Sequence, residues 1–445
     1  MNIYNKNINN IFYIFLTSHL IIWTIIPSLT NSNLPLDTIE ALAWGSNLDW
    51  GFNKHPPASA FFLEIFYYIF GSQDWAYYFL SQIFIIIAFY FVFNLANEIL
   101  NNSLLSLISV LLLESIYFYN YTSPEFNVNI CQLPFWSLVV YYSWKIFNAK
   151  EIKFLECFLL GLFGAIGFLS KYLFVYLLLS IVILFVYLIY IKKLKKFDFK
   201  YFIIIEIFLV LLLPHLIWLY ENNFITFTYG LARTGLENSG TLSHIKFPLI
   251  FLIKQIGILV PFFFLSWLLI NKRSIKFNFK DKKFIFLIFV NLLPIVLIFL
   301  TSLILGSNIR TMWMTPFYLF FGVLIVYVIK SQINVKKLKI FFLSFLTLFF
   351  LSPIFYSYVS ISQTDKRTDY PGNLIAKKVQ LTWNKDFNEP IQFVIGDEWK
   401  AGNLSYHLKS RPTWEGFIND EIFNIAKEYL CIDDICVGTY KYGNE

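Results

Sequence analysis

The sequence predicts an all-α polytopic membrane protein that ends in a small α/β domain. Of the 445 residues, 58% are hydrophobic and only 14% are charged, whereas soluble domains carry about 25% charged residues. The apolar residues form runs of about 20, the length that crosses a bilayer as a helix, and the charge balance reverses near residue 360. This composition excludes a soluble enzyme, a disordered chain and a nucleic-acid-binding protein.

Eleven apolar runs have the length of membrane-spanning helices. They lie near residues 11–30, 76–99, 103–119, 127–146, 154–170, 173–191, 201–219, 248–270, 284–304, 312–329 and 340–359. The run 58–71 is too short to cross comfortably, and we expect it to lie in the interface between lipid and water.

Lysine and arginine in short loops set the orientation of the spans. With the N-terminus in the cytoplasm, the inward loops carry nineteen of these residues and the outward loops carry five. The inward ones are Lys6, Lys145, Lys150, Lys153, Lys192, Lys193, Lys195, Lys196, Lys200, Lys272, Arg273, Lys276, Lys280, Lys282, Lys283, Lys330, Lys336, Lys337 and Lys339. Anionic membrane lipids favour such a positive inner face. Because the number of spans is odd, the C-terminal part is expected on the outward side.

Residues 360–445 differ in composition from the rest of the chain. They carry a net charge of −3, whereas residues 1–359 carry +10. We therefore divide the chain into a transmembrane domain, 1–359, and a soluble outward α/β domain, 360–445. Within the second domain, the residue pattern predicts strands at 390–395 and 435–440 and helices at 401–408 and 421–430.

The four cysteines fall into two pairs. Cys131 and Cys157 lie inside apolar runs, where a cysteine usually acts as a small packing residue. Cys431 and Cys436 lie in the soluble domain with C-x4-C spacing, which permits a local disulfide in an oxidising compartment. A zinc ribbon would need two more ligands nearby, and none is evident.

The outward loop after the first run, residues 31–75, has unusual chemistry. Residues 38–48 show helical periodicity that suits a helix lying in the interface. Asp37 falls at the N-cap position of this helix, and Glu40 follows three residues later, as in a capping box. Both acids can therefore be structural or catalytic, and the segment that follows favours a catalytic role for Asp37.

Lys54 and His55 come directly before two prolines. Pro56 and Pro57 fix the backbone and keep His55 out of helical geometry. A lysine and an imidazole held rigidly near the membrane surface suit a phosphate leaving group. The alternative is a snorkelling lysine in a proline-stiffened loop.

Other ionisable residues fall at the outward ends of the runs. Glu125 begins an apolar run, and the cost of a charge at that depth favours a place facing protein or a wet cavity. It can be a functional carboxylate or an acid that stabilises a helix N-terminus after Pro124. Lys171, Arg233 and Arg310 can bind phosphate oxygens. Alternatively, Lys171 ends a helix and the arginines anchor the chain at the interface.

Several of these segments resemble the dolichyl-phosphate-mannose–protein mannosyltransferase family, and more closely its bacterial branch, which includes the lipid A aminoarabinose transferases. The family's first outward loop is similar to Asp-Thr-Ile-Glu-Ala at 37–41, Trp-Gly-Phe at 50–52 and His-Pro-Pro at 55–57. Its second loop is similar to Thr-Ser-Pro-Glu at 122–125, and its Leu-Ser-Lys-Tyr segment to residues 169–172. The resemblance runs from about residue 11 to residue 330.

The resemblance implies a GT-C membrane glycosyltransferase, which takes a sugar from a polyprenyl phosphate on the far side of the membrane. It implies a catalytic acid at Asp37 and a second-loop carboxylate at Glu125. It also implies a contact between His55 and the donor phosphate, at the position where the aminoarabinose transferases carry a lysine. The sequence departs from the family at Thr38, where an acid is usual, and at Lys54, which replaces an acid that builds a metal site in some relatives. We therefore predict no metal.

We expect the protein to move a monosaccharide from a polyprenyl phosphate, such as undecaprenyl phosphate, to an acceptor in the bacterial envelope, such as lipid A or lipopolysaccharide. The expected location is the inner membrane, with the C-terminal domain in the periplasm. The expected catalytic acids are Asp37, Glu125 and Glu40, and the expected phosphate-binding residues are His55, Lys54, Lys171, Arg233 and Arg310. No cofactor is expected, because the lipid phosphate already carries the energy for transfer.

A membrane transporter or flippase of lipid-linked sugars is the rival class. Transporters usually show internal repeats or broken helices near the middle of the membrane, whereas the ionisable residues of this chain gather at the outward boundary. Further alternatives are a structural scaffold and a ligase that joins whole O-antigen chains. Such ligases typically lack the Asp-x-x-Glu…His-Pro-Pro loop.

Overall fold

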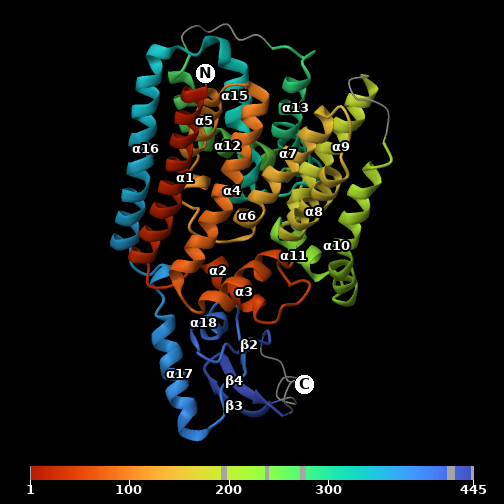
Figure 1. Ribbon diagram of the computed structural model, residues 1–445. Helices are drawn as coiled ribbons and strands as arrows, with labels where there is room; N and C mark the ends of the chain where they lie inside the picture. The colour runs from red at the N-terminus through yellow and green to blue at the C-terminus, as the bar shows by residue number, and fades with distance from the viewer. Residues whose placement is uncertain (1, 192–197, 236–239, 271–276, 418–425, 442–445) are drawn as a thin grey trace.

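The computed structural model describes residues 2–191, 198–235, 240–270, 277–417 and 426–441. Its helices form a bundle, and a four-stranded sheet with two helices lies beyond one end of that bundle (Figure 1). The N-terminus lies at the opposite end. The predicted fold class, a polytopic helical membrane protein with a small C-terminal α/β domain, is confirmed.

Seven helical segments of the described chain are long and apolar enough to cross a membrane. They are α1 (Asn2–Thr30), α4 (Asp74–Leu100), α9 (Val175–Tyr190) with the 3-10 turn before it, α10 (Tyr201–Glu221), α12 (Ser243–Leu268), α13 (Lys282–Asn291) with α14 (Leu293–Leu305), and α16 (Val335–Ser362). An eighth results if the bent pair η5 (Thr311–Tyr318) and α15 (Phe321–Ile329), which meet at 51°, is one span. The predicted number of eleven spans is not confirmed.

The other predicted spans are shorter helices separated by irregular backbone. They are α5 (Ser103–Leu111), followed by the 3-10 turns η1 (Leu112–Ser115) and η2 (Tyr117–Tyr119), then α6 (Val128–Cys131), α7 (Leu133–Asn148) and α8 (Phe154–Ser170). Non-helical backbone at such depth is tolerated where it is buried in protein. Here, the Ser81 hydroxyl donates a 2.5 Å hydrogen bond to the carbonyl of Ser123, which helps to satisfy the loop that leads to Glu125.

Loops that are predicted to face the cytoplasm lie together at the end of the bundle distant from the sheet. The ammonium of Lys200 donates to the Ile152 carbonyl at 2.9 Å, and that of Lys283 donates to the Ile99 carbonyl at 2.7 Å. These bonds join the loop before α10 to the loop before α8, and the start of α13 to the end of α4. The side of the membrane that this end faces stays a prediction.

The first outward loop forms two helices, α2 (Leu36–Gly45) and α3 (Ala58–Phe70), which lie between the bundle and the C-terminal sheet (Figure 1). Helix α2 begins two residues earlier than the expected helix, and Pro35 takes the N-cap position. Asp37 therefore lies in the first turn and caps nothing with its side chain, so the capping-box interpretation was wrong. Residues on several sides of α2 are buried, because the C-terminal domain covers the side away from the bundle.

The C-terminal domain contains α17 (Gly372–Asp386), β1 (Phe393–Ile395), α18 (Lys400–His407), β2 (Thr413–Trp414), β3 (Ala426–Ile432) and β4 (Ile435–Tyr440). The strand order is β2-β1-β4-β3, with β1 and β2 parallel and the other pairs antiparallel. The predicted strand at 435–440 matches β4, and the predicted helix at 401–408 matches α18 to within one residue.

The predicted helix at 421–430 was wrong where it can be compared, because residues 426–430 belong to β3. Residues 421–425 lie outside the described ranges. The local spacing of apolar residues favours a helix, but pairing with β4 across a tight turn overrides that preference. Cross-strand partners thus decide this segment, and local periodicity does not reveal them.

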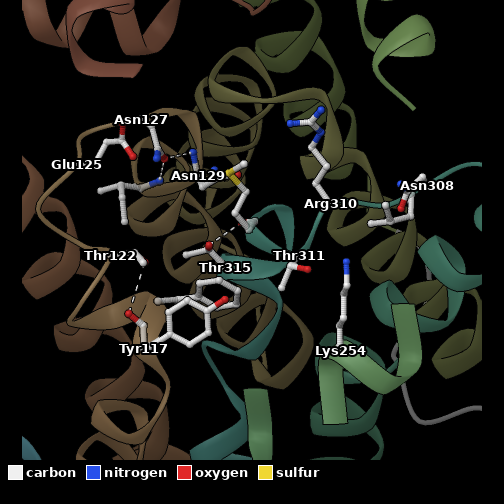
Figure 2. A pocket seen from close by; sticks show the side chains of 14 residues that line it. Tyr117, Thr122, Glu125, Asn127, Asn129, Lys254, Asn308, Arg310, Thr311 and Thr315 are labelled. Carbon is white, nitrogen blue, oxygen red and sulfur yellow. Dashed lines mark hydrogen bonds between the residues drawn. The ribbon is translucent and has the colours of Figure 1, made fainter. Parts of the chain in front are cut away.

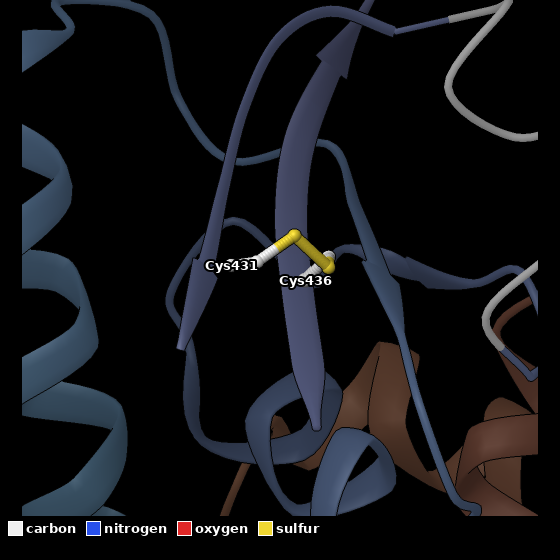
Figure 3. The surroundings of a disulfide bond; sticks show 2 residues. All are labelled: Cys431 and Cys436. Carbon is white, nitrogen blue, oxygen red and sulfur yellow. A yellow bond between two sulfur atoms is a disulfide. The ribbon is translucent and has the colours of Figure 1, made fainter. Parts of the chain in front are cut away.

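Cys431 and Cys436 form a disulfide between β3 and β4, with their Cα atoms 4.1 Å apart (Figure 3). The two residues are also direct partners in the strand register, so the bond closes the β-hairpin. It encloses a loop of only a few residues.

We expect replacement of both cysteines by serine to lower the free energy of unfolding of the C-terminal domain by about 2 kcal/mol, the entropy that so short a loop removes from the unfolded chain. Thermal unfolding of the full-length protein in detergent, followed by the fluorescence of Trp383 and its neighbours, would measure this change. An equal effect after replacement of the buried Cys131 would contradict the assignment to the hairpin.

Candidate active site

The loops that are predicted to face outward enclose a cavity of about 420 Å³. Seven of the eight predicted site residues line it, and they are Asp37, Glu40, Lys54, His55, Lys171, Arg233 and Arg310. They come from α2, the loop before α3, the junction of α8 and α9, helix α11 (Ile225–Arg233) and the loop after α14. The fold therefore brings together residues that are up to 273 positions apart in the sequence.

The eighth predicted residue, Glu125, lines a neighbouring cavity of about 520 Å³. The two cavities share Asn129, Arg310 and Met312 in their walls. Figure 2 shows Glu125 on one side of the second cavity, with Arg310 and Lys254 on the other. The first cavity is thus lined by two acids and four cations and the second by one acid and two cations, and the two cavities share part of their walls.

Asp37 and Glu125 are directly connected through the backbone. The amide of Asp37 donates to the Oε1 atom of Glu125 at 3.1 Å, and the hydroxyl of the neighbouring Thr38 donates to the carbonyl of Phe126 at 3.0 Å. Burial raises the pKa of Glu125, and the negative charge of Asp37 raises it further. The two carboxyl groups therefore titrate as a coupled pair.

Burial also raises the pKa of Asp37, while the positive charges of Lys171, Lys54, Arg233 and Arg310 oppose this effect. A carboxylate with a raised pKa is a stronger base than one in water, which suits proton abstraction near neutral pH. The surrounding cations are the groups that a phosphate would need. A carboxylate that can act as a base and the cations that can bind a phosphate thus line the same cavity.

Lys171 is 4% exposed and lies between α8 and α9. Its ammonium donates to the Oδ1 atom of Asn129 at 2.5 Å and lies 5.2 Å from the centre of the Trp313 ring. Burial lowers the pKa of Lys171 to about 7, although the charge of Asp37 works in the opposite direction. A lysine that is poised to gain a proton at this pH can be held in its charged form by an incoming phosphate.

His55 does not supply a charge. Burial lowers its pKa to about 3, and the neighbouring charges of Lys171, Lys54 and Arg233 act in the same direction. Its imidazole is therefore neutral at pH 7 and packs edge-to-face on Trp44, with ring centres 5.9 Å apart. A neutral imidazole can donate a hydrogen bond to a phosphate oxygen, and the contact of His55 with the donor phosphate stays a prediction.

Lys54 is held by two carboxylates. Its ammonium lies 3.0 Å from the Oε1 atom of Glu40 and forms a second ion pair with Glu398 of the C-terminal domain. Burial raises the pKa of Glu40 to about 7, and the charge of Glu398 adds to this rise while that of Lys54 opposes it. Glu40 therefore lies in the cavity wall as part of a charge cluster.

Two side chains of α10 contact the segment 50–52. Sequence reasoning did not predict that α10 contributes to the site. His215 contacts the Trp50 carbonyl through Nδ1 at 2.6 Å and the Tyr172 hydroxyl through Nε2 at 2.8 Å. A Cβ atom at Gly51 would lie 2.3 Å from the ring of Trp218. Glycine is thus required at this position, because the indole ring occupies the space of a side chain.

Sequence reasoning missed Asn129, Trp313 and Glu398. Asn129 is a polar residue at the start of an apolar run, which is a signal that could have drawn attention to it. Trp313 offers no such signal among so many aromatic residues. Glu398 contacts a lysine 344 positions away, and nothing local in the sequence indicates that pairing.

Within the described residues, no three His, Cys, Asp or Glu side chains lie close enough together to hold a metal ion. The acid that some relatives use for a metal is replaced by Lys54, whose ammonium lies in the same cavity wall. The absence of a metal from the working protein stays a prediction.

A bundle of apolar helices, with the helix pair α2 and α3 and a carboxylate among cations at one end, has the fold of GT-C membrane glycosyltransferases. Residues 54–218 match the family of dolichyl-phosphate-mannose-protein mannosyltransferases. The resemblance to this family that the sequence predicts is therefore confirmed. No curated protein sequence matches the chain.

Solved structures that share the fold include two of ArnT. ArnT from Cupriavidus metallidurans bound to undecaprenyl phosphate has a TM-score of 0.63 and 9% sequence identity, over 91% of this chain and 85% of ArnT. ArnT from the same organism in the apo state has a TM-score of 0.63 and 11% identity, over 92% of this chain and 86% of ArnT. At these sequence identities, the likeness to ArnT is a likeness of fold alone.

Proposed function

We propose that this protein transfers a monosaccharide from undecaprenyl phosphate to a hydroxyl group of lipid A or another lipopolysaccharide glycan, at the periplasmic face of the bacterial inner membrane. One observation carries the proposal: Asp37 and the cations Lys171, Arg233 and Arg310 line a single cavity at the end of the bundle that faces the C-terminal domain. The structure of ArnT with undecaprenyl phosphate supports a lipid phosphate as the donor.

The rim of the cavity suits a lipid-linked substrate. Helix α11 contributes Phe227 and Leu231 to the cavity wall, and these side chains are 42% and 53% exposed. Arg233 lies at the end of the same helix. Exposed apolar side chains beside the cavity offer a route for an isoprenoid chain, and the cation at the end of the same helix lies where the phosphate would bind.

In the proposed reaction, the Asp37 carboxylate accepts the proton of the acceptor hydroxyl. The hydroxyl oxygen forms a bond to the anomeric carbon of the sugar, and the bond between that carbon and the phosphate oxygen breaks. The phosphate leaves with the bonding electrons, and Lys171, Arg233 and Arg310 stabilise its charge. The neutral imidazole of His55 donates a hydrogen bond to the same phosphate.

Glu125 serves the acceptor side of the reaction in this proposal. Its carboxyl group lines the second cavity, and its Oε1 atom accepts a hydrogen bond from the amide of Asp37. A group in that position can bind an acceptor hydroxyl and keep Asp37 in place. Glu40 is ion-paired with Lys54, so we give it a role in the cavity wall and not in proton transfer.

The proposal is tested with the purified full-length protein in detergent, synthetic undecaprenyl-phosphate sugars and lipid A. Release of undecaprenyl phosphate together with a matching mass increase of lipid A is the expected result. The envelope lipids of cells with and without the gene should differ by the same increment in mass spectrometry. Movement of the intact lipid-linked sugar across vesicle membranes, without its consumption, would instead identify a flippase.

A further inference from the structure

The C-terminal domain places a buried carboxylate behind the cavity wall. Glu398 lies just before α18 and is 4% exposed. Its Oε1 atom accepts a 3.2 Å hydrogen bond from the indole nitrogen of Trp44, and its Oε2 atom pairs with the ammonium of Lys54. Since Glu40 holds the same ammonium at 3.0 Å, Lys54 joins α2 to the C-terminal domain.

The domain also packs directly on the helix that carries Asp37. A Cβ atom at Gly402 of α18 would lie 3.1 Å from the Cβ atom of Ala43 and 3.2 Å from the carbonyl oxygen of Ile39. Arg411 donates to the carbonyl of Leu42 at 2.7 Å. The backbones of α2 and α18 are therefore in close contact, and a shift of the domain would move the catalytic helix.

One cation lies between two acids at this junction. Burial disfavours the charge of Lys54, but its hydrogen bonds and ion pairs with Glu398 and Glu40 together raise the pKa of Lys54 above its usual value. The lysine therefore stays charged, and its ammonium is already engaged on two sides. A phosphate would have to compete with two carboxylates for it.

We propose that Glu398 makes the C-terminal domain part of the active site: it is a positioning residue that holds Lys54 against Glu40, so that Lys54 fixes α2 and is withheld from the donor phosphate. This inference rests on the proposed function and refines it, because it leaves phosphate binding to Lys171, Arg233, Arg310 and His55. The domain thereby acts on the catalytic helix without touching the substrate.

A double-mutant cycle of Lys54→Gln and Glu398→Gln tests this inference. Lys54→Gln removes the cation between Glu40 and Glu398, and we expect the one additional net negative charge beside the cavity to weaken binding of undecaprenyl phosphate about tenfold. In the double variant the net charge of the junction is again that of the wild type, and the affinity should return to within about threefold of the wild type. The amide oxygen that replaces the Glu398 carboxylate in that variant can still accept the hydrogen bond from Trp44.

If Lys54 itself bound the phosphate, the double variant would bind as weakly as Lys54→Gln alone, and this result would overturn the inference. Lys400→Gln is the matched control, because Lys400 pairs with Asp434 on the exposed surface of the same domain, and it should change nothing. The unfolding midpoint of each variant provides a reading that needs no donor. If the wild type does not bind undecaprenyl phosphate, the proposed function fails. Recovery of the unfolding midpoint in the double variant would still support the link that Lys54 forms between Glu40 and Glu398.

Discussion

Replacement of Asp37 by asparagine is expected to lower kcat for sugar transfer about 10³-fold, the contribution of a well-placed general base. Asparagine has nearly the same volume, so the first turn of α2 and the hydrogen bond from the residue 37 amide to Glu125 should persist. Affinity for undecaprenyl phosphate should stay the same or increase, because the substitution removes a negative charge from a cavity that contains Lys171 and Arg233.

Single-turnover kinetics with a saturating lipid donor would separate the chemical step from binding. Asp74→Asn is a suitable control, since Asp74 is also an acid at the outward end of the bundle, but its Oδ1 atom accepts a 2.6 Å hydrogen bond from the Tyr406 hydroxyl outside the cavity. We expect this control to change kcat less than about threefold. A comparable loss in both variants would mean that Asp37 acts on stability and not as the base.

The local motifs were sufficient to predict the acidic and basic residues of the cavity. Asp37 and His55 lie in short segments whose residue types and spacing indicate catalysis and phosphate binding. Lys171 directly follows the apolar run 154–170. Because all of them belong to outward loops, the predicted topology already places them at one end of the bundle. The structure adds that these residues share one cavity.

The protonation states could not be predicted in the same way. His55 and Lys171 are ordinary titratable residues in the sequence, but burial lowers both pKa values, to about 3 and about 7. Burial depends on neighbours from other helices, such as Trp44 beside His55 and Trp313 beside Lys171. Local sequence cannot specify such neighbours.

The number of spans shows a second limit of sequence reasoning. Apolar runs indicate which segments avoid water, but a segment that is buried in protein is as apolar as one that faces lipid. The run 103–119 leaves helical geometry after α5, and Glu114 in the following turn is buried beside His19, with their Oε1 and Nδ1 atoms 2.6 Å apart. Partners from α1 thus permit a broken helix where hydropathy alone predicts a continuous one.

Replacement of Lys171 by methionine is expected to weaken donor binding about 50-fold, or about 2.3 kcal/mol, the worth of a buried hydrogen bond to a charged group. Methionine keeps the length and the packing of the side chain but carries no charge. Titration with the methyl phosphodiester of undecaprenol would measure the loss. Lys246→Met, which removes an exposed lysine from the start of α12 outside the cavity, should leave the affinity unchanged.

The same lysine should make donor binding depend on pH. Because the pKa of free Lys171 is about 7, the ammonium is fully present below that pH and is lost above it, so affinity should fall about tenfold between about pH 6 and pH 8. The phosphodiester does not titrate in this range, unlike a phosphate monoester, whose second pKa is about 6. Lys171→Arg keeps its charge at every pH used, so the fall due to Lys171 should disappear and only a smaller fall, from ionisation of Glu40 in the cavity wall, should remain. A fall of equal size in the arginine variant would assign the titration to another group and would remove Lys171 from the phosphate site.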